Sequence, residues 1–207
     1  RSNKFGIALG LFVSLQLLNK FYDMDENAKC EILSSEYLIR RPWLTARRDC
    51  IKLPDGVVND EYYVLEYPDW VNVIAVTDRG EMVMVRQYRH GLQRTDFELC
   101  AGVVEDGEAP IDAARRELLE ETGYAGGVWT EAMVLSPNPS TSTNLCHCFV
   151  AERVSHVADQ HLDRTESITV HLFSRDEVYG MLCRNEIIQA LMAAPLWRWF
   201  MKEKHGL

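Results

Sequence analysis

The sequence predicts an α/β protein in which a mixed β-sheet lies between helical layers, preceded by a small β subdomain. Segments rich in β-branched and aromatic residues alternate with two or three segments of helical composition. Turn signals at residues 54–56 (PDG) and 78–80 (DRG) join two pairs of these strand-like segments. At 207 residues, 47% hydrophobic and 26% charged, the chain can build one large domain or a medium domain with an appendage.

Residues 1–29 form an apolar N-terminal extension whose role the sequence leaves open between a tag, an anchor and a docking helix. Its apolar stretch, residues 5–18, follows Arg1 and Lys4 and resembles a short signal-peptide core. That stretch is too short to span a bilayer comfortably. We therefore expect no membrane span, and attachment to a membrane through this stretch stays open.

Residues 30–67 are predicted to form a hairpin subdomain, and residues 68–207 the main domain. In the main domain, the first predicted hairpin runs from residue 70 to residue 90. Further strands are expected in WTEAMVLS, LCHCFVAERV and SITVHLFS, and helices over 177–183 and 186–201. These elements alternate as a mixed sheet with flanking helices requires.

One helix between residues 102 and 124 carries a cluster of carboxylates. Pro110 suits the first helical turn and Gly123 the position just past the last turn. Glu117, Glu120 and Glu121 then project from one side of the helix, three or four residues apart, where like charges repel. Hard divalent cations such as Mg²⁺ bind oxygen ligands of this kind and would offset the repulsion.

An ordinary acidic surface helix is the alternative for three glutamates at this spacing. The surrounding pattern, G-x5-E-x7-R-E-L-x-E-E-x-G-Y, argues against it because nine positions are defined within 23 residues. This pattern resembles the signature of the Nudix hydrolases at every defined position. The matching residues are Gly102, Glu108, Arg116, Glu117, Leu118, Glu120, Glu121, Gly123 and Tyr124.

Looser features resemble one Nudix branch, the ADP-ribose and nucleoside-diphosphate-sugar pyrophosphatases. They are the N-terminal hairpin, the phrases VRQYRHG (85–91) and FELCAG (97–102), and the prolines beyond the signature. This resemblance covers roughly residues 30–207 and implies a Nudix α/β/α sandwich. It also implies a homodimer in which the N-terminal subdomain crosses to the partner and the two sites are shared.

The resemblance also assigns a metal site. It implies that Mg²⁺, with Mn²⁺ as an alternative, is held by Glu117, Glu120, Glu121 and the backbone carbonyl of Ala101. Arg116 is expected to hold these glutamates in place through charge-assisted hydrogen bonds, rather than to be a solvated helix charge. Glu108, in the loop before the helix, is expected to have a structural or outer-shell part.

The general base is less well defined by the sequence. Relatives often supply a glutamate from a loop ahead of a late strand, and Glu166 is the best match, with Asp163 nearby. Arg164 stands at a position where some relatives place a catalytic glutamate. Glu120 or Glu121 could therefore serve instead, and Glu166 could be a plain loop carboxylate.

Four residues are candidates for binding the substrate. Arg86 and Arg89 could clamp phosphates, but three residues apart on a strand they point to opposite faces, and Arg89 is preferred. Glu98 could hold a ribose or sugar hydroxyl. Trp43, in the N-terminal subdomain, could stack on a nucleobase in the partner's site or could pack within the hairpin.

The leading functional prediction is Mg²⁺-dependent hydrolysis of a nucleoside diphosphate sugar to a nucleoside monophosphate and a sugar phosphate. The loop PNPSTSTN (137–144) offers hydroxyls and amides, which favours a broader nucleotide-sugar substrate over strict ADP-ribose. One alternative is a Nudix hydrolase of nucleoside triphosphates or dinucleotides, against which the N-terminal hairpin counts. A second is a non-catalytic nucleotide-sugar sensor, which the intact signature disfavours.

Net charge and cysteine content indicate which partners and which cellular compartment to expect. A net charge of −9 and a pI near 5.2 argue against general binding of nucleic acid, which usually requires a basic surface. The six cysteines are scattered and include no CxxC pair. We expect them to be reduced, which indicates a cytoplasmic protein.

Overall fold

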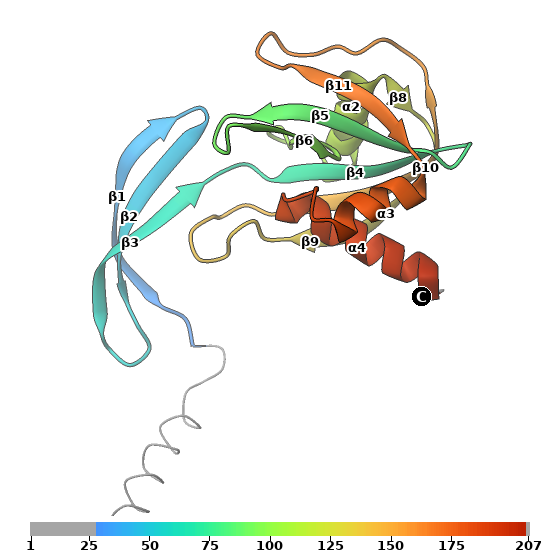
Figure 1. Ribbon diagram of the computed structural model, residues 1–207. Helices are drawn as coiled ribbons and strands as arrows, with labels where there is room; N and C mark the ends of the chain where they lie inside the picture. The colour runs from blue at the N-terminus through green and yellow to red at the C-terminus, as the bar shows by residue number, and fades with distance from the viewer. Residues whose placement is uncertain (1–27, 206–207) are drawn as a thin grey trace, which may run out of the picture. The chain divides into compact units, whose positions relative to one another are not determined.

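The structure is a computed structural model and describes residues 28–205. The predicted apolar extension falls almost wholly on residues 1–27, outside the described part. Internal packing divides the chain into two units, one through Leu65 and one from Glu66 onward (Figure 1). Within residues 28–205, no helix combines the length and the apolar character needed to cross a membrane. None of the six cysteines is in a disulfide, as the sequence predicts.

The first unit is a small antiparallel sheet in the order β1-β2-β3. Its strands are β1 (Glu31–Arg41), β2 (Leu44–Lys52) and β3 (Val58–Glu66). The predicted turn at residues 54–56 is present, and the Leu53 amide donates to the Val57 carbonyl at 2.8 Å. A second turn at Pro42 and Trp43, which the sequence analysis did not predict, divides the expected first strand into two. The unit is therefore a three-stranded sheet rather than a single hairpin.

The second unit contains an eight-stranded sheet with the central order β11-β5-β4-β10-β8. Strand β6 pairs with β5, β7 with β4, and β9 with β10. The central pair β4 and β10 is parallel and the other pairs are antiparallel, which confirms the predicted mixed sheet. The strands are β4 (Trp70–Thr77), β5 (Met82–Arg89), β6 (Arg94–Glu98), β7 (Cys100–Val103), β8 (Tyr124–Ala125), β9 (Val128–Leu135), β10 (Cys146–His156) and β11 (Ile168–Phe173).

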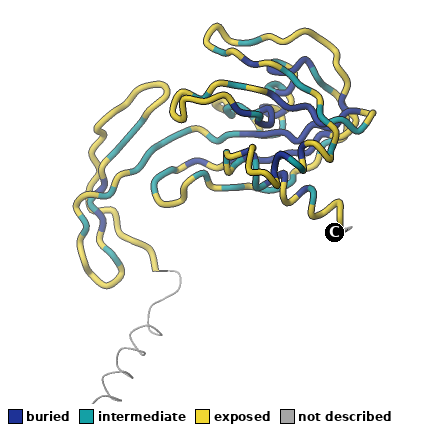
Figure 2. Tube along the Cα trace, in the orientation of Figure 1, coloured by how far each residue is buried: buried dark blue, intermediate teal, exposed yellow. Residues whose placement is uncertain are grey.

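Helices cover both faces of this sheet. Helix α2 (Pro110–Thr122) packs on one face, and α3 (Arg175–Cys183) and α4 (Ala190–His205) on the other (Figure 1). Strand β4 is buried over seven of its eight residues because both of its faces are covered (Figure 2). Val71 and Val73 belong to the core under α2, whereas Ile74 and Val76 belong to the core under α3 and α4. The predicted α/β/α sandwich is thus confirmed.

Helix α2 begins and ends where the sequence predicts. Pro110 occupies the first turn, where its missing N–H costs no hydrogen bond. Gly123 has φ 73° and donates its N–H to the Leu119 carbonyl at 2.8 Å. A β-carbon at residue 123 would overlap the carbonyl oxygen of Ala158. Glycine is therefore required here both by the left-handed backbone and by the close approach of the loop after β10.

The last predicted helix begins later than expected. The sequence analysis placed its start at Glu186, but α4 begins at Ala190. The Glu186 amide donates to the Met181 carbonyl at 2.9 Å, so this part of the chain completes the turn that ends α3. The Gln189 carbonyl then accepts from the Met192 and Ala193 amides at 3.0 and 2.9 Å and starts α4.

Candidate active site

A polar cavity of about 260 Å³ lies beside α2 in the second unit. Its walls come from the loop before α2, from α2 itself, and from the loop between β10 and β11. Six carboxylates line it with one guanidinium and one imidazole. The lining residues are Glu105, Arg116, Glu117, Glu120, Glu121, His161, Asp163 and Glu166. The structure thus gathers the predicted metal-binding glutamates and the predicted general base around one space.

Arg116 is the centre of the hydrogen bonds in this cavity. Its Nε and Nη2 donate to the two carboxylate oxygens of Glu108 at 3.1 and 3.0 Å. Nη1 donates to Glu117 at 2.8 Å and to Glu120 at 3.2 Å, and Nη2 also donates to the carbonyl of Val103 at 2.9 Å. The hydrogen bond from Arg116 lowers the pKa of Glu108. One guanidinium therefore holds three carboxylates and anchors them to β7.

Glu121 is the most buried carboxylate of the cluster, with 4% of its surface exposed. Its Oε2 accepts a hydrogen bond from the Ala101 amide at 3.0 Å. Burial is the main cause that raises the pKa of Glu121 to about 7, and the neighbouring charge of Glu117 adds to it. Burial also raises the pKa of Glu117, although the hydrogen bond from Arg116 opposes the shift. The cluster therefore gathers negative charge that the protein compensates only in part.

Gly102 leaves room for the carboxyl group of Glu117 beside β7. A β-carbon built on Gly102 would fall on the carboxyl group of Glu117, so that any larger residue would displace this side chain. This close approach explains the first glycine of the signature by packing, without any demand on backbone conformation. It also places the Ala101 backbone next to the glutamates, as the prediction of an Ala101 carbonyl ligand requires.

The loop between β10 and β11 is tied to the end of α2. The His161 amide donates to the Glu120 carbonyl at 2.8 Å, and the Gln160 side chain donates to the Glu121 carbonyl at 2.6 Å. Sequence analysis missed both residues, because nothing in their local pattern shows that they contact α2. These bonds hold the loop so that Asp163 and Glu166 line the cavity.

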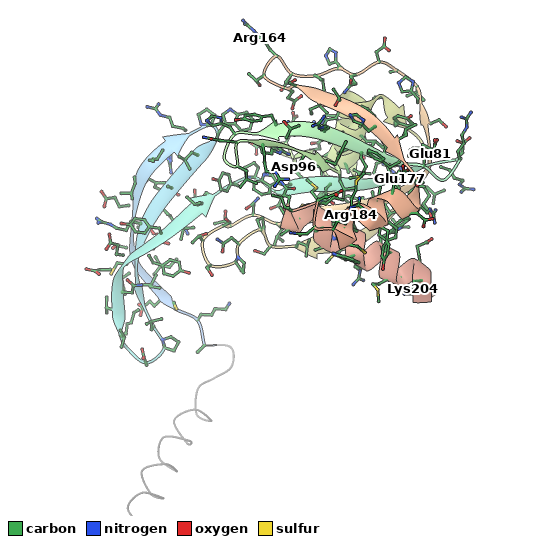
Figure 3. All side chains as sticks on the ribbon, in the orientation of Figure 1. Glu81, Asp96, Arg164, Glu177, Arg184 and Lys204 are labelled. Atoms are coloured by element: carbon green, nitrogen blue, oxygen red, sulfur yellow. The ribbon has the colours of Figure 1, made fainter. Side chains whose placement is uncertain are left out.

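The two candidate general bases of this loop, Asp163 and Glu166, both line the cavity. Glu166 and Asp163 are linked to each other, since the Asp163 amide donates to Glu166 Oε2 at 3.0 Å. The Arg164 side chain extends outward from the tip of the loop (Figure 3). Arg164, which stands where some relatives place a catalytic glutamate, is not among the residues that line the cavity.

The lining residues suit a hard divalent cation chemically. All of the candidate donors are carboxylate or carbonyl oxygens, which Mg²⁺ and Mn²⁺ prefer. Among residues 28–205, no three acidic, histidine or cysteine side chains are already gathered as a set of metal ligands. Arg116 instead bonds the Glu117 and Glu120 carboxylates. The residues fit a divalent metal by their chemistry. The carboxylates of Glu117 and Glu120 are held by the Arg116 guanidinium.

Arg89 and Glu98 form a second polar feature next to β7. Arg89 donates to both carboxylate oxygens of Glu98 at 3.0 and 2.6 Å, and this pairing is the main cause that raises the pKa of Arg89. Glu98 is buried, whereas Arg89 lines a cavity together with the Nudix-signature residue Gly102. Arg86 is exposed on the other side of β5, with its guanidinium 5.6 Å from the Phe97 ring. The preference for Arg89 over Arg86 thus agrees with the geometry.

Trp43 lies in the first unit, at the turn between β1 and β2. Its side chain is 81% exposed, so the alternative that it packs within the hairpin has no support in that unit. Its predicted part in binding a nucleobase stays a prediction.

The raised pKa of Glu121 predicts that the metal-free protein loses stability as the pH rises. Between its usual pKa of 4.5 and about 7, the folded state keeps a proton that the unfolded state has released. The free energy of unfolding should therefore fall by about 3 kcal/mol over this range. Glu121→Gln, which cannot ionise, should lack this part of the decrease. Urea unfolding followed by tryptophan fluorescence in a chelator, at a series of pH values, measures both proteins. Parallel pH profiles would contradict the prediction.

Comparison with known proteins places this site in a family. Residues 66–192 match the model of the NUDIX domain, and residues 31–65 match the nucleoside diphosphate sugar hydrolase N-terminal domain. The chain is 32% identical to an ADP-ribose pyrophosphatase of Bacillus subtilis (strain 168) over 154 residues, which cover 74% of this chain and 83% of the relative. It is 31% identical to an ADP-ribose pyrophosphatase of Mycobacterium tuberculosis (strain ATCC 25618 / H37Rv) over 167 residues, covering 79% of this chain and 80% of the relative.

The fold is also similar to that of a solved structure. A protein described as an ADP compounds hydrolase superposes with a TM-score of 0.76, at 22% sequence identity, over 86% of this chain and 96% of that protein. At this level of identity the likeness concerns the fold. The two family models, the relatives named above and the intact signature around α2 show that the chain belongs to the Nudix family and is a Nudix pyrophosphohydrolase.

Proposed function

We propose that this enzyme hydrolyses the diphosphate bond of a nucleoside diphosphate sugar, with Mg²⁺ as the metal, to a nucleoside monophosphate and a sugar phosphate. The observation that carries the proposal is the carboxylate cavity beside α2, whose Glu121 and Arg116 are hydrogen-bonded to β7, the strand that also lines the cavity of Arg89. The N-terminal domain supports a nucleotide-sugar substrate, because its family model describes nucleoside diphosphate sugar hydrolases. Relatives named as ADP-ribose pyrophosphatases support the same class.

In this proposal Glu117, Glu120, Glu121 and the Ala101 carbonyl hold the metal, with Mn²⁺ as an alternative to Mg²⁺. When bound, a divalent metal neutralises charge on the diphosphate and lowers the pKa of bound water. Arg116 orients two of the carboxylates through its hydrogen bonds to Glu117 and Glu120. Its role is that of an outer-shell group, which sets the direction of the ligand oxygens.

Hydrolysis requires that water attack one phosphorus, and that the bond from that phosphorus to the bridging oxygen break. The attacking water loses a proton, and we propose Glu166 as its acceptor because this carboxylate faces the cavity from a separate loop. Glu120 or Glu121 is the alternative acceptor. The leaving phosphate carries the bridging oxygen away, so that the products are two monophosphates.

Arg89 is proposed to hold a phosphate of the substrate. Its side chain is held by both oxygens of the buried Glu98, which fixes the direction of the guanidinium. Glu98 would therefore act on the substrate through Arg89, rather than by contacting a sugar hydroxyl as the sequence analysis expected. Arg86, on the other side of β5, has less support as a phosphate ligand. We also propose that the hydroxyl-rich loop 137–144 favours a broader range of nucleotide-sugar substrates over strict ADP-ribose.

We further propose that the enzyme is a homodimer through its N-terminal unit. All 11 residues of β1 are exposed, including the apolar side chains of Ile32, Leu33 and Leu38. A strand this exposed and this apolar is unusual for a surface that stays in water. Static light scattering of the purified protein should give twice the mass of one chain, and the mass of a single chain would contradict this part of the proposal.

The substrate prediction is tested by analysing the products of a panel of nucleotides with Mg²⁺. The panel contains ADP-ribose, ADP-glucose, GDP-mannose, UDP-glucose, ATP and a diadenosine polyphosphate. At least one sugar nucleotide should yield a nucleoside monophosphate and a sugar phosphate. Glu120→Gln and Glu121→Gln should each lower kcat on the order of 100-fold or more, because each removes a metal ligand or a proton acceptor.

The matched control is Glu203→Gln, which changes a glutamate on α4 that pairs with Arg175 and lies outside both cavities beside β7. This variant should keep the activity of the wild-type enzyme. Glu166→Gln decides the general base, since a loss confined to kcat supports Glu166 and an unchanged kcat points to Glu120 or Glu121. Cleavage of ATP alone would overturn the substrate class. Tight binding of a sugar nucleotide without any turnover would make the protein a sensor.

A further inference from the structure

The carboxylate of Glu121 is held by strand β7. It is buried and accepts a hydrogen bond from the Ala101 amide at 3.0 Å. The other two glutamates of the cluster, Glu117 and Glu120, are bonded by Arg116. A buried carboxylate has lone pairs for several donors, and lone pairs left without a partner cost free energy. One backbone amide therefore meets only part of the hydrogen-bonding capacity of Glu121.

A second group of β7, the thiol of Cys100, reaches the same carboxylate. Cys100 and Gly102 are two residues apart on β7 and so lie on one face of the strand, the face toward α2. Cys100 is completely buried and belongs to the core that contains Ala114 and Leu118 of α2. Its thiol forms a hydrogen bond with the carboxylate of Glu121. Two adjacent residues of β7 thus bond one carboxylate of α2.

The thiol is the donor in this hydrogen bond. Burial is the main cause that raises the pKa of the Cys100 thiol well above its ordinary value, and the charge of Glu121 adds to it. The thiol therefore keeps its proton. An S–H group is a weak donor, but it gains strength when its acceptor is charged and water is excluded. A completely buried, protonated thiol is not a nucleophile, so that Cys100 is suited to hold a neighbouring group.

Two donors from adjacent residues fix a carboxylate better than one. A carboxylate held by the Ala101 amide alone can still turn about the bond to its carboxyl carbon, and a second donor restricts that rotation. Both donors belong to the strand whose Ala101 carbonyl is a proposed ligand of the same metal. A ligand oxygen whose direction is already set loses less conformational freedom when the metal binds.

We propose that Cys100 is a positioning residue of the metal site, and that its thiol, together with the Ala101 amide, sets the direction of the Glu121 carboxylate. This inference rests on the proposed function, because it takes Glu121 to be a metal ligand. It adds to the site a residue that lies outside the signature, which begins at Gly102. In this role the thiol acts on the reaction only through Glu121.

Infrared spectroscopy of the metal-free protein tests the hydrogen bond itself. The S–H stretch absorbs where other protein groups do not, and its frequency falls as the hydrogen bond strengthens. The difference between the wild-type protein and Cys100→Ala isolates the band of Cys100, at a pH above the value of about 7 to which burial raises the pKa of Glu121. In a Glu121→Gln background this band should move to higher frequency, because an uncharged amide oxygen accepts more weakly. An unchanged frequency would overturn the proposal.

Two variants of Cys100 separate hydrogen bonding from packing. Serine and alanine are nearly equal in size and both smaller than cysteine, but only serine keeps a donor. In calorimetric titrations Cys100→Ala should bind Mn²⁺ about tenfold more weakly than the wild-type protein, and Cys100→Ser should recover most of the loss. Equal affinities in the two variants would overturn the proposal. The control is Cys148→Ala, which removes another completely buried thiol, outside both cavities beside β7, and should keep the wild-type affinity.

Turnover separates this inference from the proposed function. With the sugar nucleotide that the enzyme hydrolyses best, Cys100→Ala should lower kcat about tenfold with little change in KM, and Cys100→Ser should restore most of kcat. A change confined to KM would assign the thiol to substrate binding and overturn the inference. Failure of every sugar nucleotide to react would overturn the proposed function, whereas the infrared band and the affinities for Mn²⁺ would still decide the role of Cys100.

Discussion

The hydrogen bonds of Arg116 are the interaction on which the rest of the site depends. One guanidinium bonds the carboxylates of Glu108, Glu117 and Glu120 and the carbonyl of Val103. Without it, the glutamates of α2 would repel one another and turn toward solvent. With it, the negative charge is gathered against β7, where a divalent cation and a diphosphate can both be held. The positive charge needed for this comes from Arg116, which lines the same cavity as the glutamates.

The fold supports this arrangement from three directions. Pro110 and Gly123 set the two ends of α2, and the missing side chain of Gly102 makes room for the carboxyl group of Glu117 beside β7. The loop after β10 is bonded to the last turn of α2 through the side chain of Gln160. The contacts of Gly102 with Glu117 and of Gln160 with Glu121 join segments that are distant in the sequence. The site is therefore a product of the packed sheet, and a short peptide containing the signature would not form it.

Much of the fold could be predicted from the sequence because its signals are local. Proline and glycine at the ends of α2, turn residues between strands, and alternating or continuous apolar runs each act over a few residues. The glutamates of α2 and Arg116 could be assigned because the signature fixes their spacing. The turn at Pro42 and Trp43 was missed, since strongly strand-like residues on both sides of it conceal the break.

The rest of the site could not be predicted, because it depends on contacts across the sheet. The sequence gives no sign that Glu98 is buried against Arg89 or that Asn72 holds the start of α4. The late start of α4 likewise follows from the turn that closes α3, in which the Glu186 amide bonds the Met181 carbonyl. The pattern of apolar residues before Ala190 is compatible with a helix. It gives no indication of the turn that closes α3.

The most direct test of this account is the affinity of the protein for Mg²⁺ and Mn²⁺ with and without Arg116. Isothermal titration of the wild-type protein and of Arg116→Lys compares two proteins with the same charge, of which only one can make the forked hydrogen bonds. The account predicts that the wild-type protein binds a divalent metal and that Arg116→Lys binds it about 10- to 100-fold more weakly. Equal affinities in the two proteins would contradict it, because the carboxylates would then be held in place without Arg116.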